Sequence, residues 1–543
     1  MSSLPPRAAT LRTLASAAYD VVVVGGGITG AGIARDAARR GFRTALIERD
    51  DFAAGTSSRS SRLVHGGVRY LEHGWFHLVF EASRERRRLL DNAPHLVRPL
   101  RFTWPVYSHQ RLARWEIGAG LLMYDVLAMY RNVGKHKRLA MADVLAREPN
   151  VLADELVGGA TYWDAATDDA RLTVLTALDA ERAGATIINH AHVTEFARIG
   201  SHIDGVVMRD AIAGMTVRVR GSVIVNATGP WTDALRRAED PSATAAVRGT
   251  KGVHLLIPRE RIGNVGAVTL LHPADQRVMF ALPAGEYAIL GTTDTRTDAA
   301  PDQVRASVSD VRYLLEAANH YFPTARLTEA DVITAWAGIR PLIASSKPGA
   351  PSDQPRESEI AVGAHGVIGV SGGKLTTYRA MAEETVDVVA ERLQRKNARS
   401  DTAHALLPGG DIANVEAEIG AATDACGDVA VATHLVHSYG SVWRSIWALG
   451  ATSPKLRERV VPTSAAIRAE LVHAVRNEHG RTLADLLVRR THVAFESRDH
   501  GVSVAGDVAA IVAPELQWDA ERAKDAVAEY GREAKRLFGV DGA

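Results

Sequence analysis

The fold of this chain follows from the stretch Val21-Val22-Val23-Val24-Gly25-Gly26-Gly27-Ile28-Thr29-Gly30. Four valines run directly into a glycine-rich turn, a helical pattern extends to Arg40, and a second apolar run over residues 44–47 ends at Glu48. A strand, a glycine turn, a helix and a second strand in this order are typical of a Rossmann-like α/β domain. The spacing of the glycines at positions 25, 27 and 30 predicts a site for an adenine dinucleotide.

The residue types in this turn suit a dinucleotide for separate physical reasons. Gly25 permits the tight turn, Gly27 lets the backbone approach a diphosphate, and Gly30 lets the helix lie close to the strand. The start of the helix offers unpaired N–H groups and a positive dipole end. Glu48, 18 residues after Gly30, is placed to accept hydrogen bonds from ribose hydroxyls and would repel a 2′-phosphate. We expect cofactor contacts from Gly25, Gly26, Gly27, Ile28, Thr29, Gly30 and Glu48.

Composition limits the other classes of function. The chain has 543 residues, and 64 Lys and Arg against 63 Asp and Glu give a net charge of +1, so no nucleic-acid partner is expected. The single cysteine, Cys426, excludes an internal disulfide, a dithiol redox pair and a cluster held by several thiolates, and it favours a cytoplasmic location. No apolar run reaches the roughly 20 residues of a membrane span.

Three later segments contain further candidate contacts. Residues 56–67 are rich in hydroxyl groups and fit either a loop around a phosphate or sugar, or a solvated loop. Residues 222–231 read as a buried strand that runs into a glycine turn beneath an adenosine. Residues 366–378 read as a strand, a glycine turn and a helix start, where Lys374 could stabilise a reduced flavin or could face solvent.

The chain resembles the FAD-dependent glycerol-3-phosphate dehydrogenases, which are D-amino-acid-oxidase-like flavoproteins. The similarity extends from about residue 19 to beyond residue 379, followed by a helical C-terminal region of the kind this family has. It is carried by the motifs Thr56-Ser57-Ser58, Leu63-Val64-His65-Gly66-Gly67-Val68-Arg69-Tyr70-Leu71-Glu72, Asn226-Ala227-Thr228-Gly229-Pro230-Trp231, Lys251-Gly252-Val253-His254, Gly291-Thr292-Thr293-Asp294, Gly338-Ile339-Arg340-Pro341-Leu342 and Gly373-Lys374-Leu375-Thr376-Thr377-Tyr378-Arg379.

This resemblance implies a non-covalent FAD that takes a hydride from sn-glycerol 3-phosphate, which becomes dihydroxyacetone phosphate, and passes the electrons to a membrane quinone. It adds a second group of expected cofactor contacts: Thr56, Ser57, Ser58, His65, Gly66, Gly67, Ala227, Thr228, Gly229, Gly372, Gly373, Lys374, Leu375 and Thr376. No metal is expected, because the flavin accepts the electrons and arginines neutralise the phosphate.

The catalytic residues are also expected from the resemblance. Arg340 and Arg69 match the substrate-site arginines of the family, and the planar guanidinium group suits phosphate oxygens. His254 matches an active-site histidine, and imidazole is a suitable base for a hydroxyl proton. His65 remains a competitor for this role. Lys374 could hold the flavin, the substrate phosphate or both.

The predicted architecture is α/β with a helical C-terminal domain. A flexible tail is expected over residues 1–18, a linker over 394–410 and the helical domain over 411–543. A discontinuous FAD-binding domain is expected over roughly 19–110, 150–245 and 330–393. A mixed-sheet substrate domain, roughly 111–149 and 246–329, is inserted into it.

One region is strongly basic. Residues 81–140 contain 12 Lys or Arg and 5 Asp or Glu, a local excess of 12 − 5 = +7. Within it, one helix face is predicted to be apolar, formed by Leu112, Trp115, Ala119, Leu122, Val126 and Met129. Such a helix could lie on the anionic cytoplasmic face of the plasma membrane or pack into the core.

Two alternative functions stay open at this point. An oxidase would use the same cofactor and arginines but return electrons to O2 and release H2O2. A non-catalytic nucleotide sensor or RNA-associated flavoprotein would use the basic stretch 84–88. The sequence is compatible with a homo-oligomer and does not define one.

Overall fold

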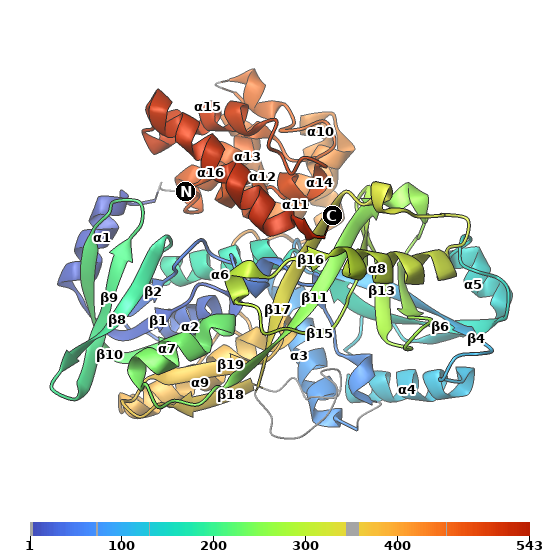
Figure 1. The fold of residues 1–543 in the computed structure, drawn as a ribbon, viewed down its shortest axis with the longest axis horizontal. Helices are drawn as coiled ribbons and strands as arrows, with labels where there is room; N and C mark the ends of the chain where they lie inside the picture. The colour runs from blue at the N-terminus through green and yellow to red at the C-terminus, as the bar shows by residue number, and fades with distance from the viewer. Residues whose placement is uncertain (1–3, 72–73, 130, 344–357, 452, 543) are drawn as a thin grey trace.

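The computed structural model describes residues 4–71, 74–129, 131–343, 358–451 and 453–542, without the side chain of Arg69. Two large sheets lie side by side, and the C-terminal helices cover one end of both (Figure 1). Within the described residues, one sheet has eight strands and the other has ten. This arrangement confirms the predicted fold class.

The first sheet contains the glycine turn. Its strand order is β18-β19-β10-β1-β2-β7, and β1 runs parallel to β2 and β10. Val21 and Val23 pack against the helices on one face of the sheet. Val22 and Val24 pack against α1, β8 and β9 on the other face, so both faces of β1 are buried. The strands are β1 (Ala18–Val24), β2 (Thr44–Ile47), β7 (Thr186–Ile188), β8 (Ala191–Ile199), β9 (His202–Asp210), β10 (Thr216–Asn226), β18 (Ser358–Val362) and β19 (Ile368–Gly372).

Helices flank this sheet and the second one. Helix α2 packs against both α6 and α9 beside β1. The helices before the C-terminal region are α1 (Arg7–Ser16), α2 (Ile28–Arg39), α3 (Phe76–Asn92), α4 (Arg114–Leu127), α5 (Met141–Arg147), α6 (Asp169–Arg182), α7 (Thr232–Glu239), α8 (Val308–Tyr321) and α9 (Tyr378–Arg392).

The second sheet is larger than the predicted substrate segments. It takes β3, β4, β6 and β17 from segments assigned above to the FAD-binding domain, so the sheet extends beyond the segments 111–149 and 246–329. The reason is that β-pairing depends on contacts distant in sequence, which a local pattern does not reveal. Its strands are β3 (Leu63–Val64), β4 (Arg98–Tyr107), β5 (Lys137–Leu139), β6 (Leu156–Ala166), β11 (Val247–Pro258), β12 (Ala267–Leu271), β13 (Val278–Ala284), β14 (Tyr287–Gly291), β15 (Thr295–Arg296) and β17 (Thr334–Ile343).

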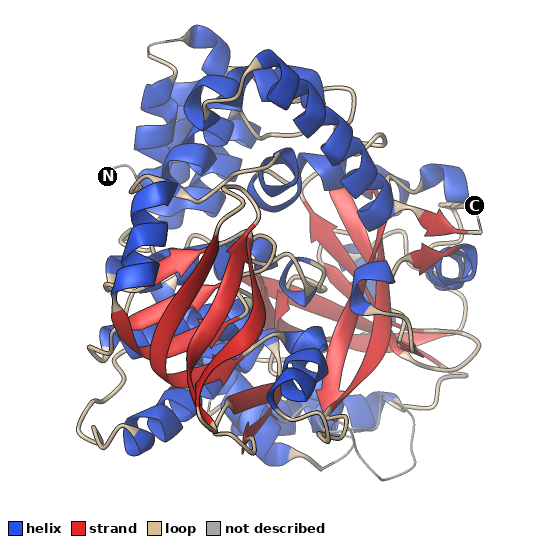
Figure 2. Cartoon of the chain, turned by 60° about the vertical axis from the view of Figure 1, so that its left-hand side comes forward, coloured by secondary structure: helices blue, strands red, loops and turns tan. Residues whose placement is uncertain are grey.

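The C-terminal region is helical and lies across the ends of both sheets (Figure 2). Its final strand, β20 (Val540–Asp541), pairs with β16 (Ala306–Ser307). The helices are α10 (Val415–Cys426), α11 (Val429–Tyr439), α12 (Trp443–Leu449), α13 (Arg468–Asn477), a π-helix (Asp485–Arg490), α14 (Val493–Glu496), α15 (Ala505–Leu516) and α16 (Ala520–Phe538).

The N-terminal segment differs from its prediction. Residues 7–16 form helix α1, whose Leu11 and Leu14 are buried against the first sheet, and Arg7 forms an ion pair with Asp210. These contacts replace the expected flexible tail with an ordered helix. Residues 394–410 contain no helix or strand, as expected for a connecting segment.

Candidate active site

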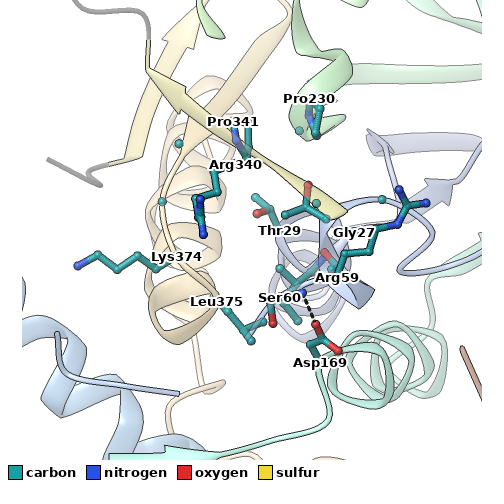
Figure 3. A pocket seen from close by; sticks show the side chains of 18 of the residues that line it. Gly27, Thr29, Arg59, Ser60, Asp169, Pro230, Arg340, Pro341, Lys374 and Leu375 are labelled. Carbon is teal, nitrogen blue, oxygen red and sulfur yellow. Dashed lines mark hydrogen bonds between the residues drawn. The ribbon is translucent and has the colours of Figure 1, made fainter. Parts of the chain in front are cut away.

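A cavity of about 550 Å³ lies between the two sheets and receives residues from both. Its size is within the usual range for a bound ligand. Figure 3 shows Thr29 of α2, Arg340 of β17 and the Lys374–Leu375 turn around this space. Seventeen of the expected cofactor contacts line it: Gly25, Gly27, Ile28, Thr29, Glu48, Thr56, Ser57, His65, Gly67, Ala227, Thr228, Gly229, Gly372, Gly373, Lys374, Leu375 and Thr376.

Four expected cofactor contacts do not line the cavity and support its wall instead. Gly26 donates its N–H to Glu48 Oε2 at 2.5 Å, and Gly66 donates its N–H to Asp164 Oδ1 at 3.0 Å. Ser58 is buried, and Gly30 packs against the preceding turn. The motif predicts that these residues lie near the ligand. The path of the backbone decides whether each one faces the cavity or the protein interior.

The glycine turn is constrained by close backbone packing. Gly25 has a φ of +107°, and a Cβ on it would lie 2.6 Å from the carbonyl oxygen of Ala227. A Cβ on Gly30 would lie 1.8 Å from the carbonyl oxygen of Gly25. The start of α2 can therefore approach β1 only with glycine here. The N–H of Ile28 at this helix start donates to Ser57 Oγ at 2.9 Å.

Glu48 follows β2 and lines the cavity. Its carboxylate accepts N–H bonds from Gly26 at 2.5 Å and from Asp50 at 2.7 Å. Burial, opposed by these two hydrogen bonds, raises the pKa of Glu48 to about 7. A carboxylate in this position can accept further hydrogen bonds from a diol.

At the other end of the cavity, Arg340 is held in a fixed orientation. Its Nη1 lies 3.0 Å from Asp294 Oδ1, and its Nη2 donates to Thr292 Oγ1 at 2.9 Å. A Cβ on Gly252 would lie 2.5 Å from Nη2, so this glycine leaves room for the guanidinium group. In the sequence Gly252 is only part of the 251–254 motif, and nothing there predicts this contact.

His254 lies on β11, which pairs with β17, the strand that carries Arg340. The imidazole is 3% exposed and stacks on Trp336 with a centroid distance of 5.4 Å. Nε2 lies 2.8 Å from Ser61 Oγ, and Nδ1 has no hydrogen-bond partner among the described residues. Burial, followed by the positive charges of Arg340 and Arg62, lowers the pKa of His254 to about 3, so the ring is neutral at pH 7.

The remaining expected catalytic residues have different outcomes. Lys374 Nζ lies 3.9 Å from the centroid of the Tyr70 ring at the cavity wall. His65 also lines the cavity, and its N–H donates to Thr376 Oγ1 at 3.0 Å. The side chain of Arg69 and residue Glu72 lie outside the described residues.

The structure adds residues that the sequence analysis did not select. Ser61 contacts His254, yet it was only one of several hydroxyl residues in the 56–67 loop. Four aromatic side chains that line the cavity come from strands of the second sheet. They are Phe102, Trp104, Tyr162 and Phe280. Only the assembled sheet places these strands beside the glycine turn.

Most of the predicted apolar face, on α4 and just after it, is exposed, whereas Leu112 packs against the core. Trp115 is 68% exposed, Leu122 52%, Val126 51% and Met129 56%. The opposite face of the helix is buried, and there Tyr124 donates to Asp164 Oδ1 at 2.6 Å. Helix α4 therefore separates this exposed apolar face from an acidic residue that lines the cavity.

The basic stretch at 84–88 is less accessible than its sequence suggests. Arg86 is 1% exposed and forms an ion pair with Asp164. Arg88 pairs with the buried Glu85, and Arg87 pairs with Asp91. Much of this positive charge is therefore neutralised within the protein, which weakens the RNA-associated alternative.

One group of residues resembles a metal site in its geometry. Oxygen and nitrogen atoms of Asp51, His190 and Asp485 lie within 4.8 Å of one another. However, Asp51 pairs with both Arg489 and Arg490, and Asp485 also pairs with Arg489. The two arginines already supply the positive charge that a metal ion would bring. The group is therefore an ion-pair network that joins the domain of the first sheet to the C-terminal helices.

Two family models match the chain. One is described as FAD dependent oxidoreductase and matches residues 20–387. The other is described as C-terminal domain of alpha-glycerophosphate oxidase and matches residues 400–523. Together they cover both sheets and most of the C-terminal helices.

Similar proteins and structures agree with these matches. Glycerol-3-phosphate dehydrogenase 2 of Mycobacterium tuberculosis is 37% identical over 532 residues, which are 96% of this chain and 89% of the relative. Aerobic glycerol-3-phosphate dehydrogenase of Staphylococcus saprophyticus is 36% identical over 485 residues, 87% of this chain and 86% of the relative. The structure of glycerol-3-phosphate dehydrogenase from Bacillus halodurans complexed with FAD has a TM-score of 0.81 and 32% identity, and it covers 98% of this chain and 97% of that one.

Proposed function

The chain belongs to the FAD-dependent oxidoreductase family, and on that premise we propose that it oxidises sn-glycerol 3-phosphate to dihydroxyacetone phosphate and passes the electrons to a membrane quinone. The observation that carries this proposal is that Arg340 and His254, on paired strands, share one cavity with the glycine turn. A phosphate-binding cation and a proton acceptor therefore lie beside a dinucleotide site.

The residues of the cavity fit FAD. The helix start at Ile28 presents its N–H toward the loop that contains Ser57, where a diphosphate can replace the serine oxygen as acceptor. Glu48 is placed to accept the ribose hydroxyls, and Lys374 lies at the other end of the cofactor site. We assign cofactor binding to the lining residues of the glycine turn, Glu48, Thr56, Ser57, the 227–229 turn and the 372–376 turn. When bound, FAD supplies a hydride acceptor.

Arg340 is assigned to the substrate phosphate. Its side chain is 17% exposed, and the guanidinium group already contacts Asp294 and Thr292, so little conformational freedom is lost when a phosphate binds. Two parallel N–H bonds can reach two phosphate oxygens. Arg69 is proposed as a second phosphate contact from the family motif alone.

His254 is assigned to the proton on the hydroxyl oxygen of C2. An FAD bound in this cavity would supply the acceptor for the hydride on C2, and the His254 imidazole would take the hydroxyl proton as the C=O bond forms. Nδ1 is the nitrogen we assign, because Ser61 already occupies Nε2. Burial, and after it the positive charges of Arg340 and Arg62, lower the pKa of His254, and a bound phosphate dianion would offset these charges.

Anaerobic mixing tests this function directly. Addition of glycerol 3-phosphate to the purified FAD-loaded protein is expected to abolish the absorbance of oxidised flavin, whereas glycerol, which lacks the phosphate, is not. Arg340→Ala is expected to retain FAD and to lower kcat/KM by at least about 10-fold, because a charge-assisted contact is lost. A wild-type flavin that glycerol 3-phosphate does not reduce would refute the proposal.

Use of quinone rather than O2 is supported by the exposed face of α4. A contiguous apolar surface flanked by basic residues suits an anionic membrane, where quinones are dissolved. The exposed basic residues nearest to it in sequence are Arg111, Arg114, Lys135, Lys137 and Arg138. We propose that the protein lies peripherally on the cytoplasmic membrane surface through α4. Among the described residues, no helix could cross a bilayer.

Vesicle sedimentation tests this membrane contact. Wild-type protein is expected to sediment with anionic vesicles at low salt, and the double substitution Leu122→Asp and Val126→Asp is expected to abolish this. Val429→Asp is a matched control, since Val429 is 63% exposed on a C-terminal helix. Wild-type protein that stays in the supernatant would exclude the contact. Hydrogen peroxide formed in proportion to substrate consumed, without quinone, would identify an oxidase instead.

A further inference from the structure

The orientation of the His254 ring depends on two neighbours. Ser61 Oγ lies 2.8 Å from its Nε2, and Trp336 stacks on its face with an interplanar angle of 16°. Ser61 belongs to the loop before β3, and Trp336 lies opposite His254 in the β11–β17 pair. The C-terminal region contacts Trp336 directly and contacts Arg62, the residue that follows Ser61.

The first contact reaches the loop of Ser61. Arg62, the next residue, points its Nη2 to Nδ1 of His492 at 3.0 Å. An arginine always donates, so Nδ1 of His492 must accept, and its Nε2 carries the proton. This Nε2 lies 2.8 Å from Asp168 Oδ2, at the start of α6. His492 therefore joins the 59–62 loop to α6 in one defined tautomer.

The second contact reaches Trp336. Phe495 of α14 packs edge-to-face against Trp336 at 5.3 Å, and its carbonyl oxygen accepts a hydrogen bond from Thr334 Oγ1 at 2.7 Å. The same Phe495 ring lies 5.0 Å from the Arg62 guanidinium carbon. Phe495 therefore contacts Trp336 directly and also contacts Arg62, the residue next to Ser61.

We propose that His492 and Phe495 are positioning residues for the oxidation of glycerol 3-phosphate: His492 holds Arg62 and Ser61, and Phe495 holds Trp336, so the C-terminal helices fix the orientation of His254. This inference rests on the proposed function, because it assumes that His254 accepts the substrate proton. It assigns the C-terminal region a role in the chemistry of a cavity whose lining comes from the two sheets.

The backbone at His492 supports a constrained role. His492 has a φ of +57° and Arg62 has a φ of +55°, a backbone conformation that residues other than glycine rarely adopt. Both side chains are held in place across the boundary between the loop and the C-terminal helices. The charged groups facing the Arg62–His492 contact are Asp168, Asp169 and Glu496, and those facing His254 are Arg340 and Arg62.

The test compares His492→Phe, His492→Asn and a matched histidine. Phe preserves volume but removes the acceptor for Arg62, whereas the side-chain oxygen of Asn can restore it. His479 is the control, because it is also buried, has a φ of +55° and contacts α6 through Glu181 at 3.1 Å. Anaerobic flavin reduction by glycerol 3-phosphate is measured from pH 6 to 9 in each variant.

His492→Phe is expected to slow flavin reduction about tenfold, to shift the acid limb of its pH profile and to leave KM within about twofold. His492→Asn is expected to recover most of the rate, and His479→Phe to change stability without changing the profile. If His492→Phe lowers only the melting temperature, the role is structural and the proposal is wrong.

A crystal structure of His492→Phe separates this proposal from the proposed function. The distance from Ser61 Oγ to His254 Nε2 is expected to exceed about 3.5 Å, beyond hydrogen-bond range. An unchanged distance of 2.8 Å would overturn the positioning role, whatever the enzyme oxidises. A wild-type flavin that glycerol 3-phosphate does not reduce, together with a displaced His254 in the variant, would instead overturn the substrate assignment.

Discussion

Gly252 is the residue at which a single methyl group should impair substrate binding without damaging the fold. A Cβ at this position would lie 2.5 Å from Arg340 Nη2, whereas ordinary contact begins at about 3.4 Å, so Gly252→Ala must move the guanidinium by about 0.9 Å. The head of an arginine is flexible, and the displacement should cost little stability. The bonds from Arg340 to Asp294 and Thr292, at 3.0 and 2.9 Å, would then lengthen to or beyond the hydrogen-bond limit.

The expected effect is a loss of one charge-assisted hydrogen bond, about 1.5–3 kcal/mol, which corresponds to about a 10- to 100-fold lower kcat/KM. The lower kcat/KM should arise mainly from a higher KM for glycerol 3-phosphate, because the phosphate group does not react. Steady-state assays with a dye acceptor measure it, and flavin absorbance checks that FAD is retained. Gly369→Ala is the control, since a Cβ there meets its nearest atom, the Ala361 oxygen, at 3.8 Å.

A double-mutant cycle makes this test specific. In an Arg340→Lys background the planar head is absent, so adding Gly252→Ala should change kcat/KM by less than about twofold. Equal effects of Gly252→Ala in both backgrounds would show that the methyl group acts elsewhere. A kcat/KM within twofold of wild type for Gly252→Ala alone would refute the steric argument.

Three further predictions concern the cofactor and the C-terminal helices. Gly30→Val should yield protein without FAD, because its Cβ would lie 1.8 Å from the Gly25 oxygen; a full flavin spectrum in the purified variant would contradict this. Ribose hydroxyls favour ionised Glu48, whose pKa is raised to about 7 without cofactor, so the Kd for FAD should rise up to about tenfold for each pH unit below 7. Flavin fluorescence titrations measure this, and Glu48→Gln should show no such dependence. Asp51→Ala removes the carboxylate between two buried arginines and should lower the free energy of unfolding by about 3–5 kcal/mol in urea titrations, whereas Asp204→Ala, which breaks a half-exposed pair, should cost less than about 1 kcal/mol.

Much of the cofactor site could be predicted because its constraints are local. The glycines at 25 and 30 are required by contacts within a few residues or with the adjacent strand, and Glu48 follows at the end of the next strand. The face of α4 was also predictable from its period. Its environment was not, because a membrane-facing helix and a core helix share the same period.

The substrate end was less predictable. Family motifs selected His254 and Arg340, but their roles remain proposals, and the contacts of Ser61, Gly252 and Trp336 came only from the structure. The composition of the second sheet was not predictable either, since β4, β6 and β17 join it from distant parts of the chain.

The sequence by itself determined the βαβ unit, its dinucleotide turn and the helical character of the C-terminal region, because backbone geometry and apolar periodicity act over short distances. Tertiary structure alone decided that β11 pairs with β17, that α4 leaves its apolar face exposed and that His492 meets Arg62, 430 residues earlier in the chain. These contacts depend on how sheets and helices pack against one another, and a pattern along the chain reports which side chains avoid water but not which distant residues cover them.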